Sequence, residues 1–128
     1  MTVARQRLGR RGEELAAAEL ERRGWTLLAR NARIAGIRGE LDIVARDGGT
    51  LVFVEVKTVH AGNATGPASP LEMVGPRKRA QLRRLAGAWT ERHAGNASAA
   101  RAIRIDVIGI VLDGAGTVVE WDHVPAAC

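Results

Sequence analysis

The sequence predicts one α/β domain in which helices cover a central mixed β-sheet. Two stretches carry apolar residues at helical spacing, and five shorter stretches are rich in Val, Ile and Leu. The elements are expected in the order α-β-β-β-α-β-β, without an internal repeat. A chain of 128 residues, 46% of them hydrophobic, is long enough to build one core. We therefore expect residues 1–128 to form a single domain.

The first expected helix spans residues 3–23. It is rich in Ala, Glu, Leu and Arg, and Leu8, Leu15 and Leu20 recur at helical spacing. Gly24 follows this stretch, and glycine is the residue that most often ends a helix. The pattern predicts an amphipathic helix that packs one face on the sheet.

Three strands are expected next, at residues 25–30, 40–45 and 50–59. Each is short and apolar, with several β-branched residues in the third. The sequence Asp47-Gly48-Gly49 separates the second strand from the third and is typical of a tight hairpin. The last two strands of this group are therefore expected to be antiparallel neighbours.

The second half of the chain begins with residues 60–76, which are rich in Gly, Pro, Asn and Ser and predict a flexible connection. Pro76 suits the first position of a helix that runs to about residue 92, with Leu82, Leu85 and Trp89 in its apolar stripe. A buried strand is expected at residues 103–112. Residues 117–123 predict a final edge strand.

The third expected strand contains an anomaly. The segment LVFVEV is apolar on both faces, yet Glu55 and Lys57 stand in it. Residues two apart in a strand project from the same face, so both side chains are expected beside each other next to Phe53. Charges at the edge of an apolar surface are costly unless they are paired or bind a metal.

The hairpin register brings a second carboxylate to this position. If Gly48-Gly49 is a two-residue turn, Asp47 pairs with Thr50, and Asp42 lies directly opposite Glu55. An odd-numbered loop would place Asp42 on the other face. Two carboxylates at that separation repel each other unless one keeps its proton or a cation lies between them.

This arrangement predicts a site for Mg²⁺ or Mn²⁺, because both ions prefer carboxylate oxygens and leave positions for water and phosphate. Lys57 is then placed to orient or deprotonate the attacking water, or to stabilise the transition state. The sequence leaves these roles of Lys57 open. It also leaves a structural alternative, in which Glu55 and Lys57 form a salt bridge at a strand end and Asp42 caps a turn.

The residues that carry this pattern resemble a known family. Residues 10–58, 76–89 and 103–110 resemble the YraN-type family of small bacterial proteins, which are predicted nucleases. That family is distantly similar to archaeal Holliday-junction resolvases and to restriction endonucleases of the PD-(D/E)XK kind. The resemblance covers about residues 8–112 and is most specific between Gly39 and Lys57. It implies a restriction-endonuclease-like core, a central mixed sheet flanked by helices.

The resemblance also assigns roles to individual residues. Asp42 matches the first acidic position of the motif, Glu55 the second, and Lys57 the lysine. Glu13, in the first helix, matches the helical glutamate that completes the resolvase site; the residues alone equally allow a surface glutamate paired with Arg10. Leu41 stands where the motif has proline. The family does not fix a substrate, and analogy with the resolvases suggests a homodimer.

The charge distribution favours a polyanionic partner. The net charge is +5, and only Lys57 and Lys78 among the nineteen basic residues are lysines. Arginine donates paired hydrogen bonds to phosphate, so the basic residues in the two helices predict contacts with the DNA backbone. The alternative is a solvated helix face. The expected nucleic-acid-binding residues are Arg10, Arg11, Arg77, Lys78, Arg79, Arg83 and Arg84.

The scarcity of aromatic residues favours duplex or branched DNA over a single strand stacked on aromatic platforms. A single cysteine, Cys128, and the absence of an apolar leader or membrane span favour a cytoplasmic protein. The sequence thus predicts a metal-dependent DNA endonuclease. Two alternatives remain: a nucleic-acid-binding module with the same fold and no cleavage activity, and a basic partner-binding protein whose acidic group is structural.

Overall fold

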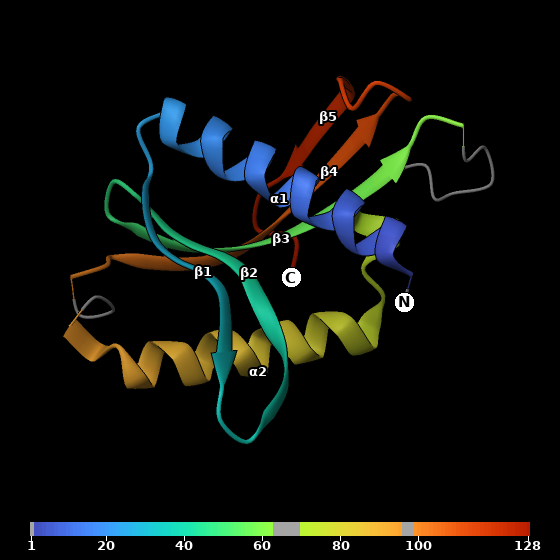
Figure 1. The fold of residues 1–128 in the computed structure, drawn as a ribbon. Helices are drawn as coiled ribbons and strands as arrows, with labels where there is room; N and C mark the ends of the chain where they lie inside the picture. The colour runs from blue at the N-terminus through green and yellow to red at the C-terminus, as the bar shows by residue number, and fades with distance from the viewer. Residues whose placement is uncertain (1, 63–69, 96–98) are drawn as a thin grey trace.

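The computed structural model describes residues 2–62, 70–95 and 99–128 as two long helices around a five-stranded sheet (Figure 1). The expected α/β class and the order α-β-β-β-α-β-β are confirmed, in agreement with a restriction-endonuclease-like core. One short 3-10 helix, η1, precedes the second long helix. The elements are α1 (Val3–Arg22), β1 (Thr26–Ile34), β2 (Ile37–Asp47), β3 (Thr50–His60), η1 (Pro70–Met73), α2 (Pro76–Arg92), β4 (Ala102–Leu112) and β5 (Val118–Val124).

The strands lie side by side in chain order, β1-β2-β3-β4-β5. Strands β3 and β4 are parallel, and each of the other neighbouring pairs is antiparallel. The parallel pair requires a crossover, which η1, α2 and their connections provide. Strand β3 is therefore central, with β2 on one side and β4 on the other, whereas β5 is an edge strand as expected.

The helices cover opposite faces of the sheet (Figure 1). Helix α1 packs Ala16, Ala17 and Leu20 on one face, and α2 packs Leu82, Leu85, Ala86 and Trp89 on the other. Alternating residues of β3 divide between the two cores, because successive side chains of a strand point to opposite faces. In the part of the chain that the structure describes, no helix is long and apolar enough to cross a membrane.

The hairpin between β2 and β3 has the predicted two-residue turn. Asp47 pairs with Thr50, and the antiparallel register continues to the pair formed by Ile43 and Val54. Gly48 has a φ of 57°, in the left-handed region that a tight hairpin turn requires. The predicted two-residue turn is therefore confirmed, with the register that it sets from Asp47 and Thr50 to Ile43 and Val54.

The first strand is longer than the sequence predicted. It continues to Ile34 instead of ending near residue 30, since β1 and β2 form a second hairpin through Ala35 and Gly36. Gly36 has a φ of 85°, which favours glycine at this turn. Within the predicted connection at residues 60–76 the structure describes η1, while residues 63–69, on which the predicted flexibility falls, lie outside the described residues.

Helix α1 approaches the sheet most closely at Gly12. A Cβ atom there would lie 1.8 Å from Thr58 Oγ1 and 2.8 Å from Thr58 Cβ, so a larger residue forces the helix away from β3. We expect Gly12→Ala to lower the free energy of unfolding by roughly 1–3 kcal/mol, as overpacking of a tight contact does. Urea unfolding followed by circular dichroism measures this difference.

Gly9→Ala is the matched control in the same helix. Nothing lies within 4 Å of a Cβ atom built at Gly9, so this substitution brings only the better helix propensity of alanine. It should stabilise the protein by about 0.5–1 kcal/mol. Equal effects of the two substitutions would contradict the close helix–sheet contact.

Candidate active site

Asp42 of β2 and Glu55 of β3 form a buried acid pair where the paired part of the two strands ends. They are the next residues after Ile43 and Val54, the last pair in the register of β2 and β3. Phe53, two residues before Glu55, belongs to the core beneath α2, as does Leu41, the residue before Asp42. Asp42 is only 8% exposed and Glu55 only 3%. That the two side chains emerge on one face of the sheet stays a prediction.

The two carboxyl groups cannot both be ionised at little cost. Burial raises the pKa of Asp42, and a hydrogen bond with Glu55 and the charge of Glu55 raise it further, to about 9. The hydrogen bond from the backbone N–H of Val56 acts in the opposite direction. The raised pKa keeps Asp42 protonated at neutral pH when no cation is bound.

Each carboxyl group has a different set of partners. Asp42 Oδ2 accepts a hydrogen bond of 2.9 Å from the backbone N–H of Val56, which fixes its orientation. Glu55 Oε2 is buried and accepts no hydrogen bond from the described residues. The ammonium group of Lys78, from α2, lies 3.2 Å from this oxygen, which makes an ion pair without hydrogen-bond geometry. Glu55 is thus a buried carboxylate with coordination capacity to spare.

Lys57 follows Glu55 on the same face of β3, as strand alternation requires. Its side chain is half-buried, and its backbone lies beside Gly109 of β4. Among the described residues the ion-pair partner of Glu55 is Lys78 rather than Lys57. The alternative in which Glu55 and Lys57 form a salt bridge is therefore not what the structure contains.

Glu13 lies on α1, which covers the face of the sheet opposite α2. Its Oε1 accepts a hydrogen bond of 2.6 Å from Asn31 Nδ2, and its charge contributes to the raised pKa of Asp42. In the pairing of β1 with β2, Arg30 lies opposite Ile43 and Ala32 opposite Leu41. Asn31 therefore lies opposite Asp42. Its φ of 50° is a conformation that asparagine tolerates better than most residues. Glu13 is thus bound to a strand residue near the acid pair rather than to Arg10.

The donor set of the site is two carboxylates with a third one nearby. Within residues 2–62, 70–95 and 99–128, no three His, Cys, Asp or Glu side chains come close enough together to hold a metal by themselves. A hard divalent cation commonly uses one or two carboxylates and completes its shell with water and phosphate oxygens. The carboxyl chemistry of the pair fits such an ion, and so does the buried Glu55 Oε2, to which no described residue donates a hydrogen bond.

The basic residues divide between the two helices and hence between the two faces of the sheet. Arg10 and Arg11 are exposed on α1, whereas the larger group lies on α2. Arg79 is turned inward, because its Nε donates a hydrogen bond of 2.8 Å to the carbonyl of Val74. A hollow of about 420 Å³ lies along α2, and five residues line it: Arg77, Lys78, Ala80, Gln81 and Arg84.

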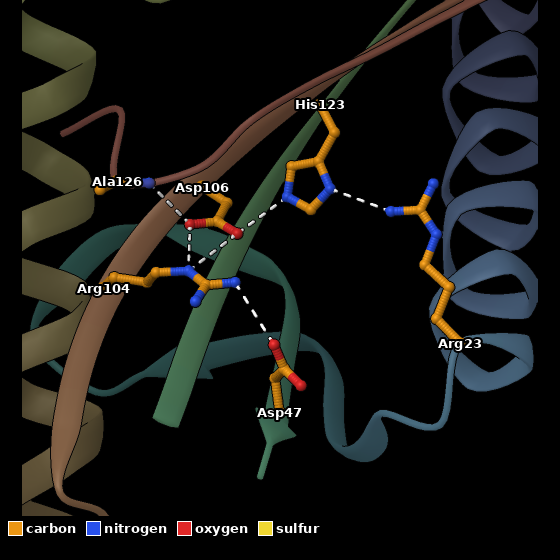
Figure 2. A network of polar contacts seen from close by, with 6 residues as sticks. All are labelled: Arg23, Asp47, Arg104, Asp106, His123 and Ala126. Atoms are coloured by element: carbon orange, nitrogen blue, oxygen red, sulfur yellow. Dashed lines mark hydrogen bonds and ion pairs between the residues drawn. The ribbon is translucent and has the colours of Figure 1, made fainter. Parts of the chain in front are cut away.

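A second polar cluster lies on the opposite face of the sheet, beneath α1 (Figure 2). Asp106 of β4 is completely buried and is hydrogen-bonded to Arg104 at 3.0 Å, to His123 of β5 at 2.8 Å and to the backbone N–H of Ala126 at 2.9 Å. Burial alone would raise the pKa of Asp106, but the hydrogen bonds from His123, Arg104 and Ala126 outweigh it and hold that pKa below its usual range. The cluster ties the end of the chain to β4.

Asp106 interrupts the apolar strand β4, and the structure pairs it with Arg104 of the same strand. The partners that sequence reasoning did not assign were His123 to Asp106, Asn31 to Glu13 and Lys78 to Glu55. For the contact between His123 and Asp106, the local sequence gives one indication: strand alternation places His123 on the same face of β5 as Trp121. The other two join residues far apart in the chain and have no local sequence pattern.

Comparison with known proteins places this arrangement in a family. The model of the uncharacterised protein family UPF0102 matches residues 12–110. A UPF0102 protein of Acidothermus cellulolyticus is 50% identical over 115 residues, which cover 84% of this chain and 83% of the relative. UPF0102 proteins of Streptomyces griseus and Chloroflexus aurantiacus are 45% and 42% identical, and their alignments cover 91% and 99% of this chain and 92% and 97% of the relatives. UPF0102 is the YraN family, so the predicted family is confirmed: this chain belongs to the uncharacterised protein family UPF0102.

Proposed function

We propose that this protein is a metal-dependent endonuclease that hydrolyses phosphodiester bonds in DNA. The observation that carries the proposal is the acid pair: two carboxyl groups from adjacent strands, both nearly buried, with a pKa of about 9 at Asp42 and a Glu55 oxygen that accepts no hydrogen bond from the described residues. A stable fold gains nothing from such a pair, because apolar residues of the same size would avoid its desolvation penalty. Strongly perturbed carboxyl groups are typical of functional sites.

Asp42 and Glu55 are the residues that would hold Mg²⁺ or Mn²⁺. When bound, the cation supplies an activated water and offsets negative charge on the scissile phosphate. The Val56 N–H keeps Asp42 Oδ2 in place, so one ligand is oriented before any ion arrives. Glu13, held by Asn31, adds negative charge near the pair and is the third acidic group of the proposed site.

Lys57 is the proposed catalytic lysine. It stands two residues after Glu55 on the same face of β3, and no ion pair within the described residues holds its ammonium group. A lysine in this position can orient or deprotonate the attacking water, or stabilise the additional charge of the transition state. These roles differ in pH dependence, because only a lysine that deprotonates the water must lose its own proton before the reaction.

The proposed substrate is duplex or branched DNA. The α2 hollow, with Arg77, Lys78 and Arg84 in its wall, is next to the acid pair, since Lys78 contacts Glu55. Arginine and lysine at this position would bind backbone phosphates without reading the base sequence. Arg10, Arg11, Arg79 and Arg83 complete the basic set proposed for DNA.

Incubation of the purified protein with branched, duplex and single-stranded DNA tests the proposal. We expect products in Mg²⁺ or Mn²⁺ and none in a chelator, with branched or duplex DNA preferred over a single strand. Failure of the protein to cut any of these substrates under any of these conditions would contradict the proposed nuclease activity.

A nucleic-acid-binding module without cleavage activity is the second candidate. Two observations favour it: the described residues contain no three-ligand acidic group, and three basic side chains line the α2 hollow. This candidate predicts DNA binding whose affinity falls steeply with salt, because phosphate contacts release counterions, and no products in any metal. Gel-shift and cleavage assays on the same samples separate the two functions.

A further inference from the structure

Lys78 lines the α2 hollow and also contacts the acid pair. Its side chain is one wall of the basic α2 hollow, and its ammonium group lies 3.2 Å from the buried Oε2 of Glu55. The Lys78 side chain is 32% exposed, whereas that of Glu55 is 3% exposed. Lys78 therefore connects a solvent-accessible basic surface with a carboxylate that solvent barely reaches.

The ion pair supplies the countercharge that the buried carboxylate needs. An ionised carboxylate without a partner is strongly disfavoured away from water, and an ammonium group at this distance offsets much of that penalty. A divalent cation at the acid pair would use the same oxygen. Since two cations so close together repel each other, Lys78 and the metal cannot both occupy the position beside Glu55 Oε2 at little cost.

We propose that Lys78 competes with the divalent cation for Glu55 and, once displaced, contacts a DNA phosphate in the α2 hollow, so that metal binding and DNA binding favour each other. The inference rests on the proposed function, because it concerns regulation of the same site. By thermodynamic linkage the two effects are equal in size. DNA whose phosphate draws Lys78 out of its ion pair strengthens metal binding by the same factor by which the metal strengthens DNA binding.

The geometry of the hollow supports the second position of Lys78. Arg77 and Arg84 line the same hollow, so a phosphate held there by their guanidinium groups would lie within the region that Lys78 borders. Lysine has a flexible four-carbon stem, which allows its charge to move while its backbone stays in α2. The hollow has a volume of about 420 Å³, enough to admit a phosphate group.

A titration with Mn²⁺ in the absence of DNA tests the competition. The proteins are the wild type, Lys78→Gln and the control Arg38→Gln, which removes the same charge. The backbone carbonyl of Arg38 accepts a hydrogen bond from Gln81 of the hollow, so Arg38 is local to it, and its side chain is exposed. We expect Lys78→Gln to bind Mn²⁺ at least about tenfold more tightly, equivalent to about 1.4 kcal/mol, and Arg38→Gln to change the affinity less than about twofold.

A second titration tests the coupling itself. Fluorescence anisotropy gives the affinity for a DNA duplex with and without Ca²⁺, which takes the same oxygen ligands, and a denaturing gel checks that the DNA is intact. The wild type should bind DNA at least about fivefold more tightly with Ca²⁺, a factor within the usual range of coupling energies. In Lys78→Gln that gain should fall below about twofold. Lys78→Met, which keeps an unbranched apolar stem, repeats both titrations and guards against a folding defect specific to glutamine.

The outcomes separate this inference from the proposed function. If the wild type and both Lys78 variants bind Mn²⁺ equally, the competition is wrong while the metal site stands. If tighter Mn²⁺ binding appears equally in Arg38→Gln, general charge rather than the ion pair is responsible and the inference is overturned. If no protein binds Mn²⁺, both the competition and the metal site are wrong.

Discussion

Glu55→Gln is expected to lower the rate of DNA cleavage by at least about 10²–10³-fold, the loss typical when one strong source of transition-state stabilisation is removed. Glutamine keeps the size of the buried side chain and one acceptor oxygen, but it removes the negative charge that a cation needs. The effect should appear in kcat more than in KM, because the α2 hollow that would bind DNA is unchanged. Single-turnover cleavage of a labelled substrate measures it.

Glu14→Gln is the matched control. Glu14 is the neighbour of Glu13 on α1, but its side chain is exposed, so the same chemical change occurs outside the site. Its cleavage rate should stay within about twofold of the wild type, as expected for a surface position. Cleavage that survives Glu55→Gln unchanged would show that the chemistry occurs elsewhere.

Asp42→Asn is expected to stabilise the metal-free protein strongly at neutral pH. The folded-state pKa of Asp42 is about 9, raised by burial and then by Glu55, whereas an unperturbed aspartate has a pKa of 3.8. A carboxyl group whose pKa is raised on folding stabilises the folded state at pH values below its unfolded-state pKa. That stabilisation is lost as the pH rises toward its folded-state pKa. The wild type therefore becomes less stable between about pH 4 and pH 9. Asparagine has no such proton to lose, while its carbonyl oxygen can still accept the Val56 N–H.

The size of the effect follows from the shift. Each pKa unit corresponds to about 1.36 kcal/mol, so the difference between Asp42→Asn and the wild type should be on the order of 4 kcal/mol at pH 7 and near zero at pH 4. Chemical denaturation at a series of pH values in a chelator measures this difference. Asp122→Asn, at an exposed position of β5, should show no such pH dependence. A constant offset for Asp42→Asn at every pH would contradict the raised pKa.

The part of the fold set by local pattern was predictable from the sequence. Pro76 begins α2 and Gly24 follows α1 as expected, because a missing N–H and a left-handed φ are local requirements. Gly48 and Gly49 fix the two-residue turn, and the turn fixes the register of β2 and β3 as far as Ile43 and Val54, the neighbours of the acid pair. Side-chain alternation in β3 then decides the face on which Glu55 emerges.

The remainder depends on how separate elements meet. The extension of β1 to Ile34 arises from pairing with β2, where Asn31 takes a left-handed conformation that its own sequence context does not indicate. The contact of Lys78 with Glu55 requires α2 to cross the sheet at one particular place, and no spacing in the chain encodes that crossing. The Asp106–His123 hydrogen bond likewise depends on the pairing of β4 with β5.

Diffraction from crystals soaked in Mn²⁺, recorded where manganese scatters anomalously, tests the acid pair most directly. We expect one anomalous peak within about 2.0–2.6 Å of oxygens from both Asp42 and Glu55, with the Lys78 ammonium moved away from Glu55, and no peak in Asp42→Asn. Manganese bound only elsewhere, or a peak that persists unchanged in Asp42→Asn, would contradict the shared cation and with it the proposed nuclease site.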